Sequence, residues 1–256
     1  MIKRLFSQAA AWLDDLIFPP GVRCLSCRRA LDEDEEDGLC PSCVRALDAL
    51  AAAQEERERV EHGALPEGIA YVHSAFVYDA QAREVVHRLK YQSIRAAAVP
   101  LAKGMAILTT GEEEILVPVP TDERRRRMRG FNQATLLAQT LSSAWGMPMC
   151  EALVRVRRCA PQTGLNEQQR RENLVGCMAV KARSVNTIRG RRILLIDDVY
   201  TTGSTAAEAA RALLAAGARS VGVLTAARAG MEKKKEDIAF LTRHKQGHSA
   251  EKPWNI

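Results

Sequence analysis

The sequence predicts an α/β fold, in which helices cover both faces of a parallel sheet and a short cysteine-rich segment precedes them. From residue 69 onwards, apolar segments typical of strands alternate with segments typical of helices, and this alternation indicates a parallel sheet. Before that point, four cysteines fall into two close pairs. With 256 residues, 46% of them hydrophobic, the chain is long enough for one sizeable core and a small accessory module.

The N-terminus resembles a signal peptide only in part. Ser7 and Gln8 interrupt its apolar stretch, and two aspartates follow without a cleavage site. Apolar residues at helical spacing over residues 2–17 predict a short amphipathic helix that docks on the rest of the protein, with a membrane-surface helix as the alternative. No apolar run approaches the ~20 residues that span a bilayer, so we expect no transmembrane segment. Without an export signal the cytoplasm is the expected compartment, where thiols stay reduced.

The paired cysteines predict a metal site. Cys24 and Cys27 form one pair, Cys40 and Cys43 the other, with twelve residues between the pairs. Two residues between cysteines let both sulfurs of a tight turn point at one ion, so two such turns supply a tetrahedral shell for Zn²⁺. The intervening loop is too polar to build a core, and a metal would offset the chain entropy that apolar burial cannot. Four cysteine ligands leave no position for water, which predicts a structural zinc; four unrelated reduced thiols, or two redox pairs, are the alternatives.

Composition divides the chain into three parts. Residues 44–62 predict a helix, because they are rich in Ala, Leu, Glu and Arg and lack Gly and Pro. The stretch that follows contains both Gly and Pro and marks a boundary. We therefore expect an N-terminal helix, four-cysteine ribbon and linker helix in residues 1–62, and an α/β domain in residues 63–228. Residues 229–256 carry three consecutive lysines and few apolar residues, which predicts a disordered basic tail.

The segments of the α/β domain follow from periodicity and from the placement of Gly and Pro. The stretches that indicate strands are 69–79, 115–120, 153–158, 191–198 and 220–228. The stretches that indicate helices are 82–92, 130–146 and 204–217. Strands that alternate with helices in this way place the sheet between two helical layers.

The turn after the strand at 191–198 predicts a phosphate site. In an open parallel sheet, ligands bind beyond the carboxyl ends of the strands. Ser204 or Thr205 would cap the helix that follows, so the turn presents unpaired backbone N–H groups in front of the positive end of a helix dipole. Gly203 lets the backbone curl close to a phosphate monoester, and the hydroxyls of Thr201 and Thr202 add donors.

Two adjacent carboxylates stand at the tip of the same strand. Asp197 and Asp198 would repel a phosphate, but they suit the vicinal hydroxyls of a neighbouring polyol, or Mg²⁺ held through water. A carboxylate pair beside a phosphate cradle therefore predicts a sugar phosphate as the ligand. The alternative is an ordinary strand-to-helix turn, which explains the Ser and Thr residues but not two acids at the end of a buried apolar strand.

Three segments resemble known families. Residues 196–205, IDDVYTTGST, resemble the phosphoribosyl pyrophosphate (PRPP) signature of type I phosphoribosyltransferases. Residues 117–138 and 161–180 resemble segments typical of competence protein ComF-type phosphoribosyltransferases, and the four-cysteine zinc ribbon belongs to the same architecture. The resemblance spans roughly residues 14–228 and implies a type I phosphoribosyltransferase-like fold with a small N-terminal zinc ribbon.

The resemblance also implies a reaction. The phosphoribosyl group of PRPP would be transferred to an acceptor, and pyrophosphate would leave with Mg²⁺. Asp197 and Asp198 would hold the ribose, and residues 201–205 the 5′-phosphate. In the related fold, the loop after the strand at 115–120 faces the pyrophosphate; here it contains five arginines, of which we expect Arg129 to make the contact.

A hood and one lysine complete the implied site. A flexible hood over residues 159–178 would close on PRPP, with Arg170 or Arg171 reaching the leaving pyrophosphate. Lys90 is a further candidate for the anion. The base-recognition segment is not identifiable, so no acceptor is named.

The charge leaves a second function open. The formal charge of +6 and the pI of about 9.0 suit an anionic partner, although a solvated basic surface explains them equally well. ComF-type proteins are associated with DNA uptake or with the use of external DNA. The alternative is therefore a non-catalytic PRPP-binding protein whose ribbon and arginine loop engage single-stranded DNA, in association with the DNA-uptake machinery.

Overall fold

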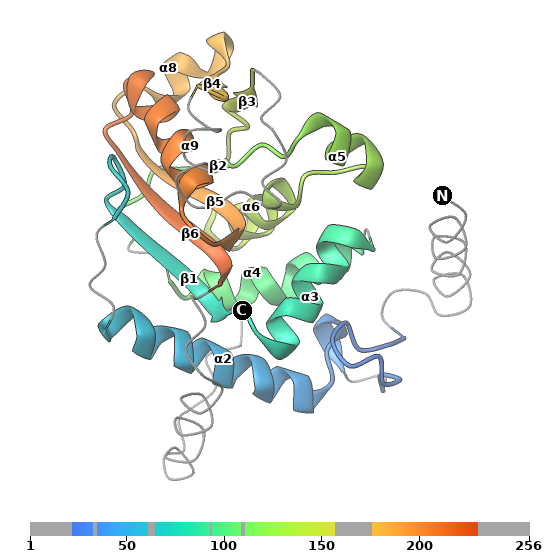
Figure 1. The fold of residues 1–256 in the computed structure, drawn as a ribbon. Helices are drawn as coiled ribbons and strands as arrows, with labels where there is room; N and C mark the ends of the chain where they lie inside the picture. The colour runs from blue at the N-terminus through green and yellow to red at the C-terminus, as the bar shows by residue number, and fades with distance from the viewer. Residues whose placement is uncertain are drawn as a thin grey trace.

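The computed structural model describes residues 22–32, 35–60, 65–92, 94–108, 111–156 and 176–229 (Figure 1). Three predictions lie outside these ranges: the N-terminal helix, nearly all of the hood and nearly all of the tail. Arg170 and Arg171 also lie outside them. In the described part of the chain, no helix is both long and apolar enough to cross a bilayer.

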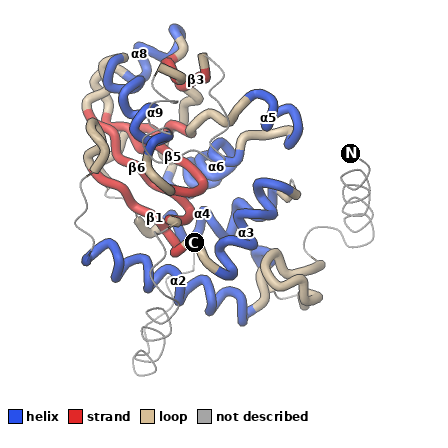
Figure 2. The backbone as a smooth tube through the Cα atoms, viewed as in Figure 1, coloured by secondary structure: helices blue, strands red, loops and turns tan. Residues whose placement is uncertain are grey.

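The predicted parallel sheet is confirmed. It has four strands in the order β1-β6-β5-β2, all parallel, so that β5 and β6 lie in the middle (Figures 1 and 2). The bounds are β1 (Tyr71–Val77), β2 (Ile115–Pro118), β5 (Arg192–Tyr200) and β6 (Ser220–Arg228).

The strand predicted at 153–158 lies outside this sheet. β3 (Leu153–Arg155) pairs antiparallel with β4 (Met178–Val180) in a separate two-stranded sheet. Just before β3, an isolated parallel bridge joins Met149 to Leu116 of β2, at the edge of the main sheet. An apolar and polar pattern over a few residues does not say which sheet a strand will join, because either pairing satisfies its backbone.

Helices flank the sheet. They are α2 (Pro41–Val60), α3 (Ala80–Tyr91), α4 (Ala98–Ala106), α5 (Glu123–Arg129), α6 (Gln133–Trp145), α8 (Val185–Ile188) and α9 (Ser204–Ala215), with 3₁₀ turns η1 (Glu36–Gly38), η2 (Arg95–Ala97) and η3 (Ala182–Ser184). The loop predicted to carry the arginines is in fact helix α5. The Asp122 carboxylate accepts hydrogen bonds from the N–H groups of Arg124 and Arg125, and Gly130 ends the helix with a φ of 80°.

The two faces of the sheet build two cores. On β5, Leu194 and Ile196 pack with α3, α4 and α6, whereas Ile193 and Leu195 pack with α9. Adjacent residues of one strand therefore serve opposite faces, and both faces are covered. This arrangement explains why the sequence of β5 is a continuous apolar run rather than an alternating one.

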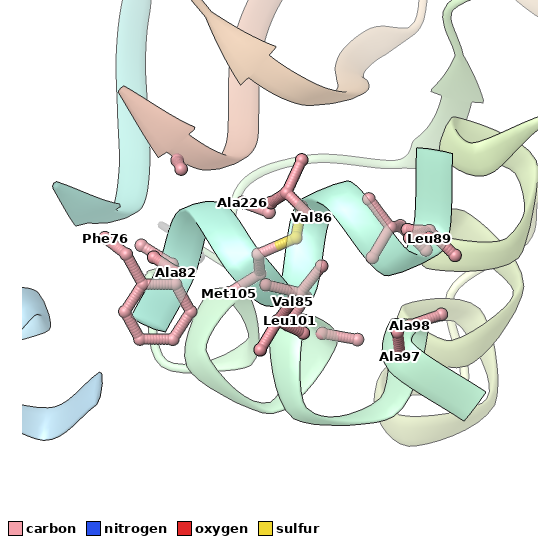
Figure 3. Close-up of a cluster of buried hydrophobic side chains, with 14 of the residues drawn as sticks. Phe76, Ala82, Val85, Val86, Leu89, Ala97, Ala98, Leu101, Met105 and Ala226 are labelled. Carbon is pink, nitrogen blue, oxygen red and sulfur yellow. The ribbon is translucent and has the colours of Figure 1, made fainter. Parts of the chain in front are cut away.

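Helices α3 and α4 pack tightly under β1 and β6. Figure 3 shows Val85 of α3 beside Leu101 and Met105 of α4, with Phe76 of β1 at one end and Leu89 of α3 towards the other. A Cβ on residue 104, a glycine, would overlap the Phe76 ring, so the glycine is needed for this close approach. α4 was not predicted from the sequence, because Pro100 and Gly104 conceal it; a proline in the first turn of a helix costs no hydrogen bond.

The cysteine-rich segment joins the same core. Leu25 and Leu39 belong to the hydrophobic cluster that contains α3 and α4. The helix predicted at 44–62 is α2, which begins slightly earlier and runs alongside edge strand β1 (Figure 1). Cluster and helix therefore pack directly on the α/β body, while the division of the chain at residue 63 stays a prediction.

Candidate functional site

Asp197 and Asp198 of β5 lie just beyond the point where the neighbouring strand β2 ends. β5 pairs with β2 only as far as Ile196, opposite Pro118, but it continues beside β6 to Tyr200. The strand therefore runs two residues beyond the end predicted at residue 198. Because β2 has already ended, Asp197 and Asp198 still stand at the carboxyl edge of the sheet, where parallel α/β folds bind ligands.

A lysine from α3 reaches the second aspartate. The Nζ atom of Lys90 lies 2.7 Å from Oδ1 of Asp198, and both side chains are largely buried. Burial disfavours the Lys90 ammonium, but the carboxylate of Asp198, helped by Asp197, outweighs it and raises the lysine pKa. The site thus holds a fixed positive charge against its pair of acids.

The first aspartate is difficult to ionise. Burial, together with the negative charge of Asp198, raises the pKa of Asp197 to about 7, although Lys90 and Arg155 act in the opposite direction. Its Oδ1 accepts a hydrogen bond of 2.8 Å from the backbone N–H of Asp198. Near neutral pH the doublet therefore carries less than two full negative charges.

The turn after β5 leaves the backbone donors at the start of α9 without a side-chain cap. Gly203, with a φ of 74°, is the N-cap residue, and no side chain caps the helix. We expected Ser204 or Thr205 in that position. Ser204 is instead the first helical residue, and its hydroxyl lies 2.9 Å from that of Thr202. The first N–H groups of α9 have no intrahelical acceptor, so they are available to an anion.

The turn also requires a glycine. A Cβ on residue 203 would overlap the hydroxyl of Tyr200 and lie 2.9 Å from its Cζ atom. The positive φ adds backbone strain for any residue with a Cβ. The backbone can therefore pass this closely over Tyr200 only with glycine there.

The arginines of α5 differ in their surroundings. Arg124 to Arg127 are exposed, and Arg126 and Arg127 pair with Glu123 at 3.6 Å and 3.3 Å. Arg129 is partly buried, and its guanidinium carbon lies 5.2 Å from the centre of the Tyr91 ring. Burial lowers the pKa of Arg129, while Tyr91 and Asp198 favour its charged form. Of the five arginines of α5, Arg129 is thus the one that is partly buried and contacts an aromatic ring.

The four cysteines form one cluster. Their Sγ atoms all lie within 4.8 Å of one another, and those of Cys27 and Cys40 are 3.6 Å apart. Around one Zn²⁺ with Zn–S bonds of about 2.3 Å, tetrahedral sulfurs would stand roughly 3.8 Å apart, so the cluster fits a single ion. The backbone N–H of Cys40 donates to the Cys24 sulfur at 3.4 Å, which suits a thiolate.

The two cysteine pairs are held in different ways. The first lies in a small hairpin, closed by a bridge between Arg23 and Ala30. The second lies at the start of α2, with Cys40 just before the helix and Cys43 in its first turn. The positive end of the helix dipole favours negative charge at Cys40 and Cys43, and therefore a bound metal with thiolate ligands.

An arginine joins this cluster to α3. Arg88 is buried, and its Nη2 donates to the Ser26 carbonyl at 3.4 Å and to Glu84 at 2.9 Å. Ser26 lies between the cysteines of the first pair. The helix that places Lys90 against Asp198 thus also contacts the cysteine loop.

Comparison with known proteins places the chain in a family. Residues 127–252 match the Phosphoribosyl transferase domain. The DNA utilization protein YhgH of Salmonella typhimurium (strain LT2) is 32% identical over 222 residues, which cover 80% of this chain and 95% of the relative. Competence protein ComFC of Bacillus subtilis is 29% identical over 220 residues, 83% of this chain and 86% of the relative. The chain belongs to the ComF family.

Other members and solved structures match in part. Competence protein F of Haemophilus influenzae is 40% identical over 117 residues, which cover 45% of this chain and 51% of that ComF protein. Among solved structures, the glutamine PRPP amidotransferase of Bacillus subtilis, complexed with ADP and GMP, gives a TM-score of 0.40 at 20% identity, over 55% of this chain and 30% of the enzyme. The family match and the parallel sheet confirm the predicted type I phosphoribosyltransferase fold of this ComF chain.

One cation that interacts with Asp197 was not predicted from the sequence. Arg155 of β3 donates from Nε to the Pro120 carbonyl at 2.9 Å, beside the end of β2. Burial lowers its pKa, and the charge of Asp197 opposes the shift. The only signal for it in the ComF sequence is an arginine between two apolar residues. Lys90, a minor candidate before, is the closest cation to the aspartates among the described residues.

Proposed function

We propose that this ComF protein binds PRPP and transfers its phosphoribosyl group to an acceptor, with release of pyrophosphate. One observation carries the proposal: the Asp197–Asp198 doublet, with Lys90 against it, adjoins an uncapped helix start at the Gly203 turn. Acids that suit a diol and amides that suit a phosphate are thus a few residues apart, as the two ends of a ribose 5-phosphate require.

The ribose half of the ligand uses β5 and the turn. The 2′- and 3′-hydroxyls would donate to Asp197 and Asp198, and the 5′-phosphate would accept from the amides and hydroxyls of residues 201–205. When the diol docks, Lys90 would move from Asp198 towards the phosphate groups. The ion pair therefore keeps the buried acids partly neutralised until the ligand arrives.

The pyrophosphate half uses cations from other elements. Arg129 stands at the end of α5, and Arg171, outside the described residues, would approach from the hood. Carboxylate and phosphate oxygens are the ligands that Mg²⁺ prefers, so Mg²⁺ would arrive with PRPP and neutralise the leaving group. The chain would contribute positioning and electrostatic stabilisation of the pyrophosphate.

The proposed step is a displacement at the anomeric carbon. The bond from C1 of the ribose to the pyrophosphate oxygen breaks, and pyrophosphate leaves with the electron pair. A new bond forms between C1 and a nucleophilic nitrogen of the acceptor, which gives up its proton to solvent. We propose no general base among the described residues.

The same proposal covers the cysteine cluster and the layout of the chain. Cys24, Cys27, Cys40 and Cys43 would hold a structural Zn²⁺ that ties the hairpin to α2. Residues 1–62 and 63–228 would act as ribbon module and transferase domain, in the cytoplasm, where the thiols stay free for the metal.

Turnover tests the function. Pyrophosphate release from Mg²⁺ and PRPP should appear with at least one member of a panel of nucleobases and amines, and Asp197→Asn/Asp198→Asn should lower it at least about tenfold. A loss in the double variant without a change in far-UV circular dichroism supports the site. Absence of release with every acceptor would contradict the catalytic half of the proposal.

A second candidate is favoured by the exposed side of α5. Arg124 to Arg127 face solvent next to Met128, which is 64% exposed, and relatives are named for competence and DNA utilization. In this reading the protein binds PRPP without turnover and engages single-stranded DNA. Neutralising two of these arginines should flatten the salt dependence of DNA affinity by about one unit of slope per lost phosphate contact. An unchanged slope would count against it.

A further inference from the structure

The last residue of α3 holds an aromatic ring at the surface, one residue after Lys90. Tyr91 is 65% exposed, the most of any large hydrophobic residue in the described part of the chain. The residue before it, Lys90, lies 2.7 Å from Asp198. The final turn of α3 thus places one side chain against the acids and the next under an arginine.

That arginine is held by the ring. The guanidinium of Arg129 lies over the Tyr91 ring, with its carbon 5.2 Å from the ring centre, within the range of a cation–π contact. Its Nε is buried without a hydrogen-bond partner, and no ion pair of Arg129 occurs within the described ranges. The ring face is therefore the contact that fixes the guanidinium.

An arginine that contacts a ring face keeps its N–H donors free, whereas an arginine paired with a carboxylate does not. Arg127 gives donors to the carboxylate of Glu123, which would compete with an incoming phosphate. A ring face takes no N–H group, because the donors of a guanidinium lie in its plane. Arg129 is thus oriented while its fork of donors remains available for bidentate contact with an anion.

We infer that Tyr91 is a positioning residue, which orients Arg129 towards the pyrophosphate of a PRPP docked at Asp197 and Asp198. The inference rests on the proposed function and extends it to a residue outside the signature. Its ring, not its hydroxyl, does this, because the contact is with the face of the ring. A Phe at position 91 should therefore keep Arg129 in place, whereas a Leu, which is apolar but has no ring, should not.

A double-mutant cycle tests the inference. Binding of PRPP with Mg²⁺ is measured by calorimetry for wild type, Tyr91→Leu, Tyr91→Phe, Arg129→Gln and the double variant Tyr91→Leu/Arg129→Gln. We expect Tyr91→Leu to weaken binding by about two- to fivefold, the worth of an exposed cation–π contact. Tyr91→Phe should retain nearly all of the affinity. In the Arg129→Gln background, Tyr91→Leu should have no effect.

A second readout needs no ligand. In ¹⁵N spectra, the Nε–H of Arg129 should carry a ring-current shift that Tyr91→Leu removes and Tyr91→Phe keeps. Equal losses from Tyr91→Leu in both backgrounds, or a Phe variant that behaves like Leu, would overturn the inference alone. A wild-type protein that binds no PRPP would overturn the proposed function, and the inference with it.

Discussion

At the scale of single residues, the buried carboxyl of Asp197 predicts in which direction the stability of the fold changes with pH. Its folded pKa of about 7 lies above the ordinary value near 4, so between these values the folded state binds more protons than the unfolded state. Stability contributed by the neutral acid is thus lost as the pH rises through that window. Asp197→Asn removes the loss, because the amide stays neutral.

We expect Asp197→Asn to melt about 4 °C or more above wild type at pH 8, and at nearly the same temperature at pH 4. The amide oxygen still accepts the hydrogen bond from the Asp198 N–H, so the fold around the turn is kept. Thermal melts at pH 4, 6 and 8 give the difference. A variant that is less stable than wild type at pH 8 would show that the charged form is favoured in the fold.

A second residue-scale prediction compares two glycines. Gly203 and Gly130 share a positive φ, of 74° and 80°, but a Cβ meets the Tyr200 ring at the first and nothing within 4 Å at the second. Gly130→Ala should therefore cost about 1–2 kcal/mol of unfolding free energy from backbone strain alone. Gly203→Ala should cost clearly more, as urea titration can measure. Equal losses would mean that the turn over Tyr200 relaxes freely.

Reasoning from the sequence could bring residues together only where they are close along the chain. Asp197, Asp198 and the turn at 201–205 are neighbours in sequence, so their proximity needed no fold. The roles of Arg155 and Tyr91 were not predicted. Their partners, Asp197 and Arg129, come from elements that are distant along the chain. No periodicity or spacing identifies such pairs.

At the scale of elements, α5 shows how end residues decide a short helix. Four consecutive arginines gave the appearance of a basic loop, whereas the Asp122 cap and Gly130 define the helix. Both end signals were visible in the sequence. Repulsion between the arginines disfavours a helix in this segment. Glu123 reduces that repulsion by pairing with Arg126 and Arg127.

The cysteine hairpin gives the element-scale prediction. Because Leu25 and Leu39 share a core with α3 and α4, loss of the metal should destabilise the whole chain rather than the hairpin alone. Cys40→Ser, or chelation of wild type, should lower the melting temperature by about 5 °C or more. Cys150→Ser, a partly buried cysteine outside the cluster, is the matched control and should change little.

Cobalt substitution adds a direct readout of the cluster. The four-thiolate site should give the visible absorption of tetrahedral Co²⁺, and Cys40→Ser should lose it. Wild-type and chelated protein that melt together would contradict a structural metal at these cysteines.

At the scale of the whole molecule, the alternation of strand and helix segments predicted the α/β architecture, but it did not predict which strands are neighbours in the sheet. The sheet, its two covered faces and the ligand edge came from general rules for parallel sheets. That β1 pairs with β6, at opposite ends of the described domain, depends on long-range packing around Phe76 and Ala226. The same packing joins the cysteine-rich segment to α3.

Binding of PRPP at the end of β5 is the claim on which the function depends, and calorimetry with Mg²⁺ tests it most directly. Wild type should take up one PRPP per chain, and Asp198→Asn should bind about ten- to a hundredfold more weakly, because hydrogen bonds to a charged acceptor are lost. Glu114→Gln, which removes one negative charge before the start of β2 at the opposite edge, should bind like wild type. No heat of binding in wild type, or the same affinity in all three proteins, would contradict the account.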